Sequence, residues 1–206
     1  MPDLDYRFDE ITERYYDRQL DDVRAFAREV PLTHPATLEI GSNAGKFTEA
    51  MAALHPERSF IGVEVRKKHV DRANERLDAA GHTHARVLRV SAELAVPILF
   101  DEGQLSDVFI LFPDPWWKER HQKRRVIRDE FLDVLSPKMA TGATLWVRTD
   151  VGPLANDMRA VLNARADFEP MPLAEHPLDA FPRSERDTRS VKLGLPVHRL
   201  YYVKRG

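Results

Sequence analysis

The chain contains no cysteine, which excludes disulfide scaffolds, thiolate zinc sites and cysteine nucleophiles. It also lacks a long hydrophobic run. Residues 94–100 and 108–112 are the longest such runs, whereas a membrane-spanning helix needs about 20 apolar residues. The N-terminal MPDLDYRFDE is acidic and does not have the basic-then-apolar order of a signal peptide. We therefore expect a soluble, cytoplasmic protein with no membrane partner.

The chain has no general excess of charge, because 31 basic and 33 acidic side chains leave a net charge of −2. The charges are nevertheless unevenly placed. Residues 1–30 carry nine acids and five bases, whereas residues 118–128 carry six bases and one acid. A basic run of this kind is either a solvated helix face or a contact for an anionic partner.

Internal repeats and Gly/Ser linkers are also absent from the 206 residues. This length predicts one domain over residues 1–206, with residues 1–35 as an N-terminal helical extension. A chain of this size buries enough surface to fold without a stabilising metal, and we expect no metal site.

Apolar segments of two kinds alternate along the chain, and this alternation predicts the fold class. We expect strands at 36–41, 59–65, 84–91, 107–112, 143–149 and 197–204, and helices at 8–30, 45–54, 67–80, 122–135 and 151–164. Strands that alternate with helices indicate an α/β fold, with a mostly parallel, doubly wound sheet and helices on both faces. In such sheets ligands bind beyond the carboxyl ends of the strands.

A glycine loop follows the first expected strand, in the segment EIGSNAGKF. Gly41 and Gly45 bracket a tight turn into a helix, and Glu64 ends the next strand. An acid about 20 residues after such a loop can accept both ribose hydroxyls of a nucleoside cofactor, although a plain strand-to-helix turn has the same pattern. Glu39 favours S-adenosylmethionine (SAM) over NAD, because a carboxylate suits an ammonium and a sulfonium and repels a pyrophosphate.

The segment FPDPWWKERHQKRR follows the expected strand 107–112. Asp114 lies between two prolines, which hold it stiffly at the end of the strand. Trp116 and Trp117 can stack on a base or pack in the core. An acid, an aromatic and a basic cluster at a ligand-binding edge predict a nucleic-acid site, in which the bases hold phosphates. The basic side chains are Lys118, Arg120, Lys123, Arg124, Arg125 and Arg128.

Asp150 follows Thr149 at the end of the expected strand 143–149. We expect Asp150 to cap the helix 151–164, whether or not it also binds substrate.

Residues 36–204 resemble the bacterial tRNA (guanine-N7)-methyltransferases, which are SAM-dependent enzymes of the class I Rossmann-like fold. The most specific match is FPDPWWKERHQKRR at 112–125, close to the family signature F-P-D-P-W-x-K-x-R-H-x-K-R-R. The other matches are LEIG at 38–41, IGVEV at 61–65, TD at 149–150 and LG at 193–194.

The resemblance implies a seven-stranded, mostly parallel sheet with an antiparallel C-terminal strand. It implies methylation at N7 of guanine 46, in the variable loop of tRNA, with Asp114 as the catalytic and cofactor-site acid. It further implies SAM contacts from Glu39, Gly41, Gly45 and Glu64, substrate contacts from Lys118 and Asp150, and tRNA phosphate contacts from Arg120, Lys123, Arg124 and Arg125.

The sequence departs from the family pattern in three places. Asn43 and Ala44 interrupt a loop that is usually G-x-G-x-G. Ser91 stands where an Asp or Asn contacts the adenine of SAM. The segment SERDTR at 184–189 replaces T-x-x-E-x-R, so that Ser184, Asp187 and Arg189 are the matching substrate contacts.

Two other functions remain open from the residues. The chain can be a SAM-dependent methyltransferase of another nucleic-acid base, because an acid–proline–aromatic loop also suits amine targets. It can also be a non-catalytic RNA-binding relative. An NAD oxidoreductase is disfavoured, since no His or Tyr stands at the expected strand ends to handle a hydride. The sequence leaves a monomer and a homodimer equally open.

Overall fold

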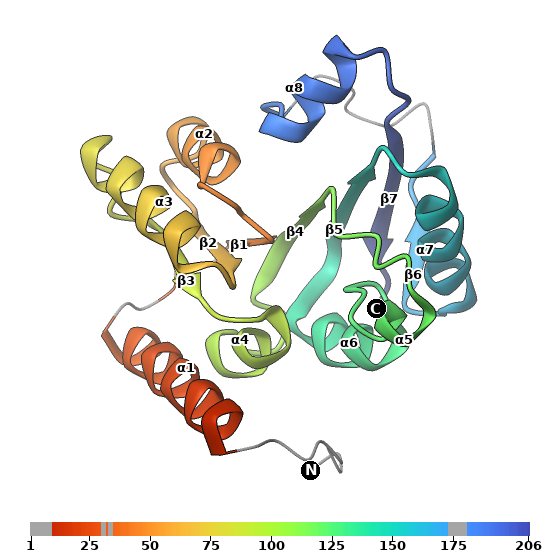
Figure 1. Ribbon diagram of the computed structural model, residues 1–206. Helices are drawn as coiled ribbons and strands as arrows, with labels where there is room; N and C mark the ends of the chain where they lie inside the picture. The colour runs from red at the N-terminus through yellow and green to blue at the C-terminus, as the bar shows by residue number, and fades with distance from the viewer. Residues whose placement is uncertain (1–9, 30–31, 33–34, 173–180) are drawn as a thin grey trace.

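A computed structural model describes residues 10–29, 32, 35–172 and 181–206. Figure 1 shows a central sheet between two groups of helices. The strands are β1 (Ala36–Ile40), β2 (Ser59–Glu64), β3 (Ala85–Arg89), β4 (Leu105–Leu111), β5 (Met139–Thr149), β6 (Phe168–Pro170) and β7 (His198–Lys204). The helices are α1 (Glu10–Glu29), α2 (Lys46–Leu54), α3 (Lys67–Ala79), α4 (Ala92–Leu99), α5 (Glu119–Gln122), α6 (Asp129–Leu135), α7 (Gly152–Ala164) and α8 (Glu185–Lys192), with a 3₁₀ turn, η1, at Ser136–Lys138.

The described strands form one seven-stranded sheet in the order β3-β2-β1-β4-β5-β7-β6. Strands β1 to β5 pair in parallel, and β7 runs antiparallel to both of its neighbours. This arrangement confirms the predicted α/β class with its antiparallel C-terminal strand. The strand order reverses between β1 and β4, so the switch point at which doubly wound sheets bind ligands lies at the carboxyl ends of these two strands.

The two faces of the sheet carry separate cores, because successive side chains of a strand point to opposite faces. Leu38 and Val108 pack with α4, α6 and α7 on one face. Phe109 and Trp146 pack with α2 and α3 on the other. The register pairs Glu39 with Gly62 and with Phe109, which places this acid on the α2 and α3 face.

Helix α1 lies close to its expected bounds and packs against α4. Val23 is buried there, whereas Asp21 and Asp22 are exposed. In Figure 1, α1 lies at the opposite end of the molecule from α8. The acidic helix α1 therefore covers one side of the fold, away from the carboxyl ends of β4 and β5.

The expected helix 122–135 is wrong, because the chain forms two short helices, α5 and α6, with residues 123–128 between them. Arg128 is extended at φ −156°, which ends any continuous helix. Ile127 is buried in the core and Arg125 turns back to donate to the Pro115 carbonyl. Tertiary contacts thus override a local sequence of good helix formers.

Four further elements differ from the expectation. Helix α4 was not expected, since Pro97 interrupts its apolar run, yet the helix forms around this proline. Strand β5 begins four residues early, at Met139, and a register shift between Leu105 and Asp107 of β4 accommodates the extra residues. Helix α8 and the short strand β6 lie between the expected helix 151–164 and the expected strand 197–204, where the sequence predicts no element.

Gly62 marks the closest packing between β2 and the loop that follows β1. A Cβ at Gly62 would lie 2.8 Å from Ser42 Oγ and 2.9 Å from Val87 Cγ2. We expect Gly62→Ala to lower the free energy of unfolding by about 1–3 kcal/mol, because the added methyl overpacks a buried strand. Urea denaturation measures this change. Gly152→Ala is the matched control, since its Cβ would meet nothing closer than 3.5 Å. Equal stability of the two variants would contradict the packing argument.

Candidate active site

The loop between β1 and α2 contains three residues in the left-handed region. Their φ angles are +78° at Gly41, +50° at Asn43 and +70° at Gly45. Asn tolerates this conformation better than most other residues with a side chain. Asn43 therefore takes a left-handed conformation that glycine adopts freely, and the departure from G-x-G-x-G does not prevent a tight loop.

Two close approaches hold this loop against its neighbours. A Cβ at Gly45 would lie 2.6 Å from Ala73 Cβ, so α2 can begin this close to α3 only with glycine. Ser42 is buried beside Gly62, and its hydroxyl oxygen has no hydrogen-bond partner within the described chain. A buried hydroxyl without a partner is costly, and a ligand atom at this point would satisfy it.

Glu39 lies under the loop with 6% of its surface exposed. The Thr48 hydroxyl donates a hydrogen bond to its carboxyl group. Burial raises the pKa of Glu39 to about 8, because removal from water penalises the charged form. A cationic group placed next to Glu39 would favour its carboxylate form.

Glu64 fixes the loop from the neighbouring strand. Its Oε2 accepts from the Asn43 backbone amide at 3.2 Å, and its Oε1 accepts from the Arg66 amide at 2.9 Å. A carboxylate has about four lone-pair sites, so each oxygen retains acceptor capacity. Ser91 follows the adjacent strand β3 and is half-buried at the start of α4.

The segment after β4 turns sharply and presents Asp114. Phe112 has φ +54°, and its amide donates to the Arg148 carbonyl of β5 at 2.7 Å. The Asp114 side chain is 63% exposed, and its Oδ2 lies 3.9 Å from Arg66 Nη2. This contact brings the segments that follow β2 and β4 together on either side of β1.

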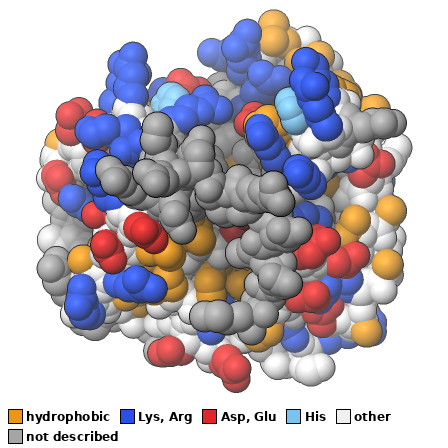
Figure 2. All heavy atoms as spheres, turned by 60° about the horizontal axis from the view of Figure 1, so that its bottom comes forward, with side chains coloured by type: hydrophobic (Ala, Val, Ile, Leu, Met, Phe, Trp, Pro, Cys, Tyr) orange, Lys and Arg blue, Asp and Glu red, His pale blue; other side chains and the backbone are white. Residues whose placement is uncertain are grey.

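The basic residues after Asp114 take different roles. Arg124 is exposed and lies over the Trp116 ring, 5.3 Å from its centroid. Arg125 has only 16% of its side chain exposed, donates to the Pro115 carbonyl and pairs with Asp157 of α7 at 2.7 Å. Lys118, Arg120 and Lys123 are exposed, whereas Arg128 is only 24% exposed and pairs with Glu93 of α4. Lys and Arg side chains also gather in the upper part of the face in Figure 2.

Asp150 does not cap α7, so that expectation is wrong. The Val151 amide donates to Thr149 Oγ1 at 3.2 Å, and Val151 is the N-cap residue without a side-chain cap. Asp150 instead accepts from Arg186 and from the Ser190 hydroxyl of α8. The Asp150 carboxylate is thus engaged by one charged and one neutral donor of α8 and makes no cap for α7.

Helix α8 is tied to the sheet through a buried ion pair. Arg148 Nη1 lies 2.7 Å from Asp187 Oδ2, and the two side chains are 5% and 2% exposed. Asp187 Oδ1 is buried and has no hydrogen bond within the described residues. Ser184 caps α8 by accepting from the Asp187 amide, and Arg189 is exposed on the same helix.

Arg148 and Lys46 are contacts that the sequence analysis missed. Lys46, at the start of α2, pairs with Glu185 of α8 at 2.9 Å. The signal for Arg148 was a charge in the otherwise apolar strand 143–149, but its partner is 39 residues away. Figure 1 shows α8 beyond the arrowheads of β4 and β5, so these pairs close the site from that side.

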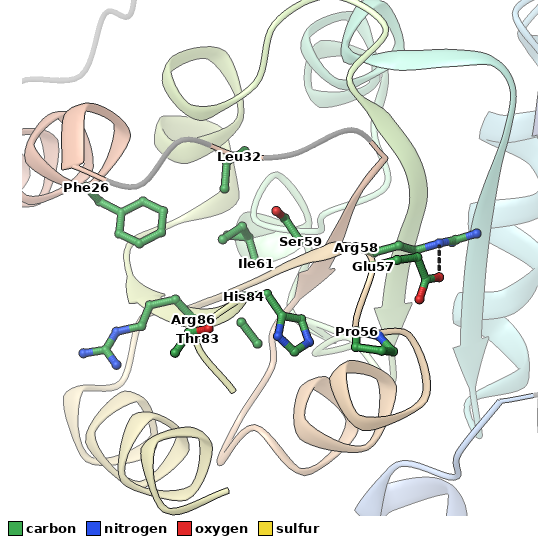
Figure 3. Close-up of a pocket in the computed structure, with 11 residues that line it drawn as sticks. Phe26, Leu32, Pro56, Glu57, Arg58, Ser59, Ile61, Thr83, His84 and Arg86 are labelled. Atoms are coloured by element: carbon green, nitrogen blue, oxygen red, sulfur yellow. Dashed lines mark ion pairs between the residues drawn. The ribbon is translucent and has the colours of Figure 1, made fainter. Parts of the chain in front are cut away.

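A separate cavity of about 270 Å³ lies at the opposite edge of the sheet. Figure 3 shows Phe26 of α1 facing Ser59 and His84, which begin or precede β2 and β3. Its walls contain none of the predicted site residues. In the described chain, no helix is both long and apolar enough to cross a bilayer, and no three His, Asp or Glu side chains gather as metal ligands do.

Comparison with known proteins agrees with this geometry. Residues 33–200 match the family described as "Putative methyltransferase". A tRNA (guanine-N(7)-)-methyltransferase from Myxococcus xanthus is 37% identical over 172 residues, which are 82% of this chain and 84% of the relative. A protein of the same name from Synechococcus sp. (strain JA-2-3B'a(2-13)) is 33% identical over 178 residues, covering 84% and 73%.

Among solved structures, a SAM-dependent methyltransferase from Aquifex aeolicus covers 96% of this chain and 100% of its own at a TM-score of 0.56 and 15% identity. The strand order and the glycine loop thus define the fold of SAM-dependent methyltransferases. Within this class, the chain belongs to the family of tRNA (guanine-N(7)-)-methyltransferases.

The residues present fit SAM as the cofactor. Three polar groups lie at one glycine loop. They are the Ser42 hydroxyl, which has no partner within the described residues, the buried Glu39 carboxyl, and the Glu64 carboxylate, which retains free acceptor sites. This set offers an acid for an ammonium group and an acceptor for hydroxyls. The loop leaves open space at Gly41, where an added Cβ would meet no atom within 4 Å.

Glu39 makes stability depend on pH with a defined sign. Its pKa of about 8 in the folded chain lies above the unfolded value of 4.5, so folding favours the protonated form. Its contribution is complete below pH of about 4.5 and is lost as pH rises through about 8. We expect Glu39→Gln to remove this loss and to gain on the order of a few kcal/mol against wild type between pH values of about 5 and 9.

Thermal or urea denaturation across that pH range measures the effect. The matched control is Glu75→Gln, which changes an exposed acid on α3. Parallel pH profiles for wild type and Glu39→Gln would show that Glu39 does not hold a proton in the folded chain.

Proposed function

We propose that this chain transfers the methyl group of SAM to N7 of guanine 46 in the variable loop of tRNA, in the cytoplasm. The observation that carries the proposal is the position of Asp114. On one side, Asp114 lies close to Arg66, whose backbone amide donates to Glu64 beside the glycine loop. On the other side, it precedes the exposed basic residues within 118–124. The printed names of the relatives support the tRNA guanine substrate.

In this proposal the cofactor contacts come from Glu39, Gly41, Gly45, Glu64 and Ser91. Glu39 faces the ammonium group of SAM, and Glu64 accepts the ribose hydroxyls. When bound, SAM supplies an electrophilic methyl group. Glu39 becomes a carboxylate once a cation lies beside it, because the attraction offsets the cost of its burial.

Asp114 acts on the guanine. N7 carries a free lone pair, so no general base is needed and the chain contributes position and electrostatics. The Asp114 carboxylate stabilises the positive charge that the purine gains. It also accepts from guanine N1–H and the exocyclic amine, a pattern that adenine does not offer. The base leaves its stack to reach this acid, as in other base-modifying enzymes.

The remaining contacts hold the substrate around Asp114. We assign Lys118, Asp150, Ser184, Asp187 and Arg189 to the guanine nucleotide. The buried Asp187 Oδ1, which lacks a partner in the described chain, supports this assignment for α8. Arg120, Lys123 and Arg124 hold phosphates. Arg125 lies next to them in the chain, but its guanidinium is already paired with Asp157.

A methyl-transfer assay tests the reaction. Purified protein is incubated with labelled SAM and unmodified tRNA, and the digested nucleosides are identified. We expect N7-methylguanosine, and a transcript with adenosine at position 46 should lose the label. A different methylated nucleoside would replace the proposed substrate. Binding of tRNA without transfer and without SAM binding would favour the non-catalytic alternative.

Asp114 is tested by Asp114→Asn, which keeps the shape and removes the charge. We expect kcat to fall by about 10²–10³-fold, because one preorganised electrostatic group is lost, while the Kd for tRNA stays within a few-fold. Steady-state kinetics and tRNA binding measure the two quantities. The control is Asp101→Asn, an exposed acid at the opposite edge of the sheet. Equal losses in kcat and affinity would remove the catalytic assignment.

Arg124 is tested by the salt dependence of tRNA binding. Each phosphate contact contributes about one unit to the slope of log K against log salt, so Arg124→Ala should flatten the slope by about one. Arg24→Ala, which removes an exposed arginine from the acidic helix α1, is the control and should leave the slope unchanged. An unchanged slope in Arg124→Ala would exclude a phosphate contact there.

A further inference from the structure

Two adjacent tryptophans after Asp114 have opposite environments. Trp116 takes φ +45°, and its ring contacts Arg124 and lies 5.8 Å from the His121 ring. Trp117 is 65% exposed, more than any other large hydrophobic side chain that the structure describes. An indole of this size normally gains free energy by burial, so its outward position requires an explanation.

Backbone contacts hold the loop on the N-terminal side of Trp117. The Phe112 amide is bonded to β5, and Arg125 holds the Pro115 carbonyl at 3.1 Å while it pairs with α7. Pro113 and Pro115 stiffen the same segment. Trp116 is half-buried, and its ring contacts Arg124 and His121. The Trp117 ring is thus exposed next to a loop whose backbone is held in place.

The neighbours of Trp117 select the kind of partner. Lys118 and Arg120 follow it and are exposed, and Asp114 precedes it by three residues. A flat apolar ring within a basic surface matches a nucleobase on a phosphate backbone. A protein partner would instead need a contiguous apolar patch, and the exposed residues next in the chain are charged.

We propose that Trp117 stacks on a nucleobase that flanks the target guanine of tRNA. The proposal rests on the proposed function and adds a second base contact to it. Three residues of chain span at most about 10 Å, so the indole is within reach of a base next to the one at Asp114. When guanine leaves the stack its neighbour loses a stacking face, and Trp117 replaces that face.

Trp117 also occupies the open position of the signature F-P-D-P-W-x-K. The stacking contact is therefore a property of this chain and not of the residues that the signature fixes. It contributes affinity without charge, unlike the basic residues around it.

Trp117→Ala and Trp117→Phe test the contact through tRNA binding at several salt concentrations. Stacking on an aromatic ring contributes enough that Trp117→Ala should weaken tRNA binding by about tenfold. Trp117→Phe should restore most of it. The slope of log K against log salt should stay unchanged, because no phosphate contact is lost. The control is Leu54→Ala, which removes a 57% exposed apolar side chain at the C-terminal end of α2.

A fluorescent base provides the direct readout. Unmodified tRNA carries 2-aminopurine in place of one or the other base that flanks position 46. We expect binding to wild type and Trp117→Phe to quench one of the two labelled tRNAs, and Trp117→Ala to leave it bright. SAM affinity should be equal in all variants.

Affinity and quenching in Trp117→Ala within twofold of wild type would overturn the stacking contact, as would a flattened salt slope or wild type that does not bind tRNA. The proposed function fails separately. Wild type that binds tRNA with Trp117-dependent quenching but forms no N7-methylguanosine keeps the contact and loses the activity. Wild type that forms this product while Trp117→Ala behaves identically keeps the activity and loses the contact.

Discussion

Arg148 connects three parts of the site, and their relative positions depend on it. Its backbone carbonyl accepts from Phe112 at the start of the Asp114 segment. Its guanidinium donates to Asp187 of α8 and to the Tyr201 hydroxyl of β7. A buried charge without its partner is destabilising by about 3–5 kcal/mol, so the pair is a strict requirement once the arginine is inside. Arg148, a residue of the central strand β5, thus connects the segment that carries Asp114 to helix α8.

The charges of α8 extend this constraint. Three consecutive residues, Glu185, Arg186 and Asp187, pair with Lys46 of α2, Asp150 after β5 and Arg148 within β5. The first pair is exposed and screened by salt, whereas the last is buried and is not. Helix α8 is thereby held by three ion pairs, one to α2 and two to the end of β5, although its own sequence is short and strongly polar.

The sequence predicted the sheet, because this follows from local periodicity, and the rule for parallel strands placed the candidate site at their carboxyl ends. It did not predict the pairing of Arg148 with Asp187, since nothing local connects residues 39 positions apart. It also failed at residues 123–128, where good helix formers are bent by the contacts of Arg125 and Ile127. The different exposure of Trp116 and Trp117 accompanies a positive φ at Trp116, and residue type alone does not predict it.

The 2.6 Å approach between the Cβ position of Gly45 and Ala73 Cβ limits which side chains these two positions can accept. The two positions share one small volume, so a larger residue at either can be accepted only if the axes of α2 and α3 move apart. Ala73 is on the buried side of α3, so a larger side chain there cannot turn to solvent. The movement of the helix axes would therefore displace Lys46 and the turn before it. The packing of the glycine loop therefore limits which substitutions the crossing of α2 and α3 tolerates.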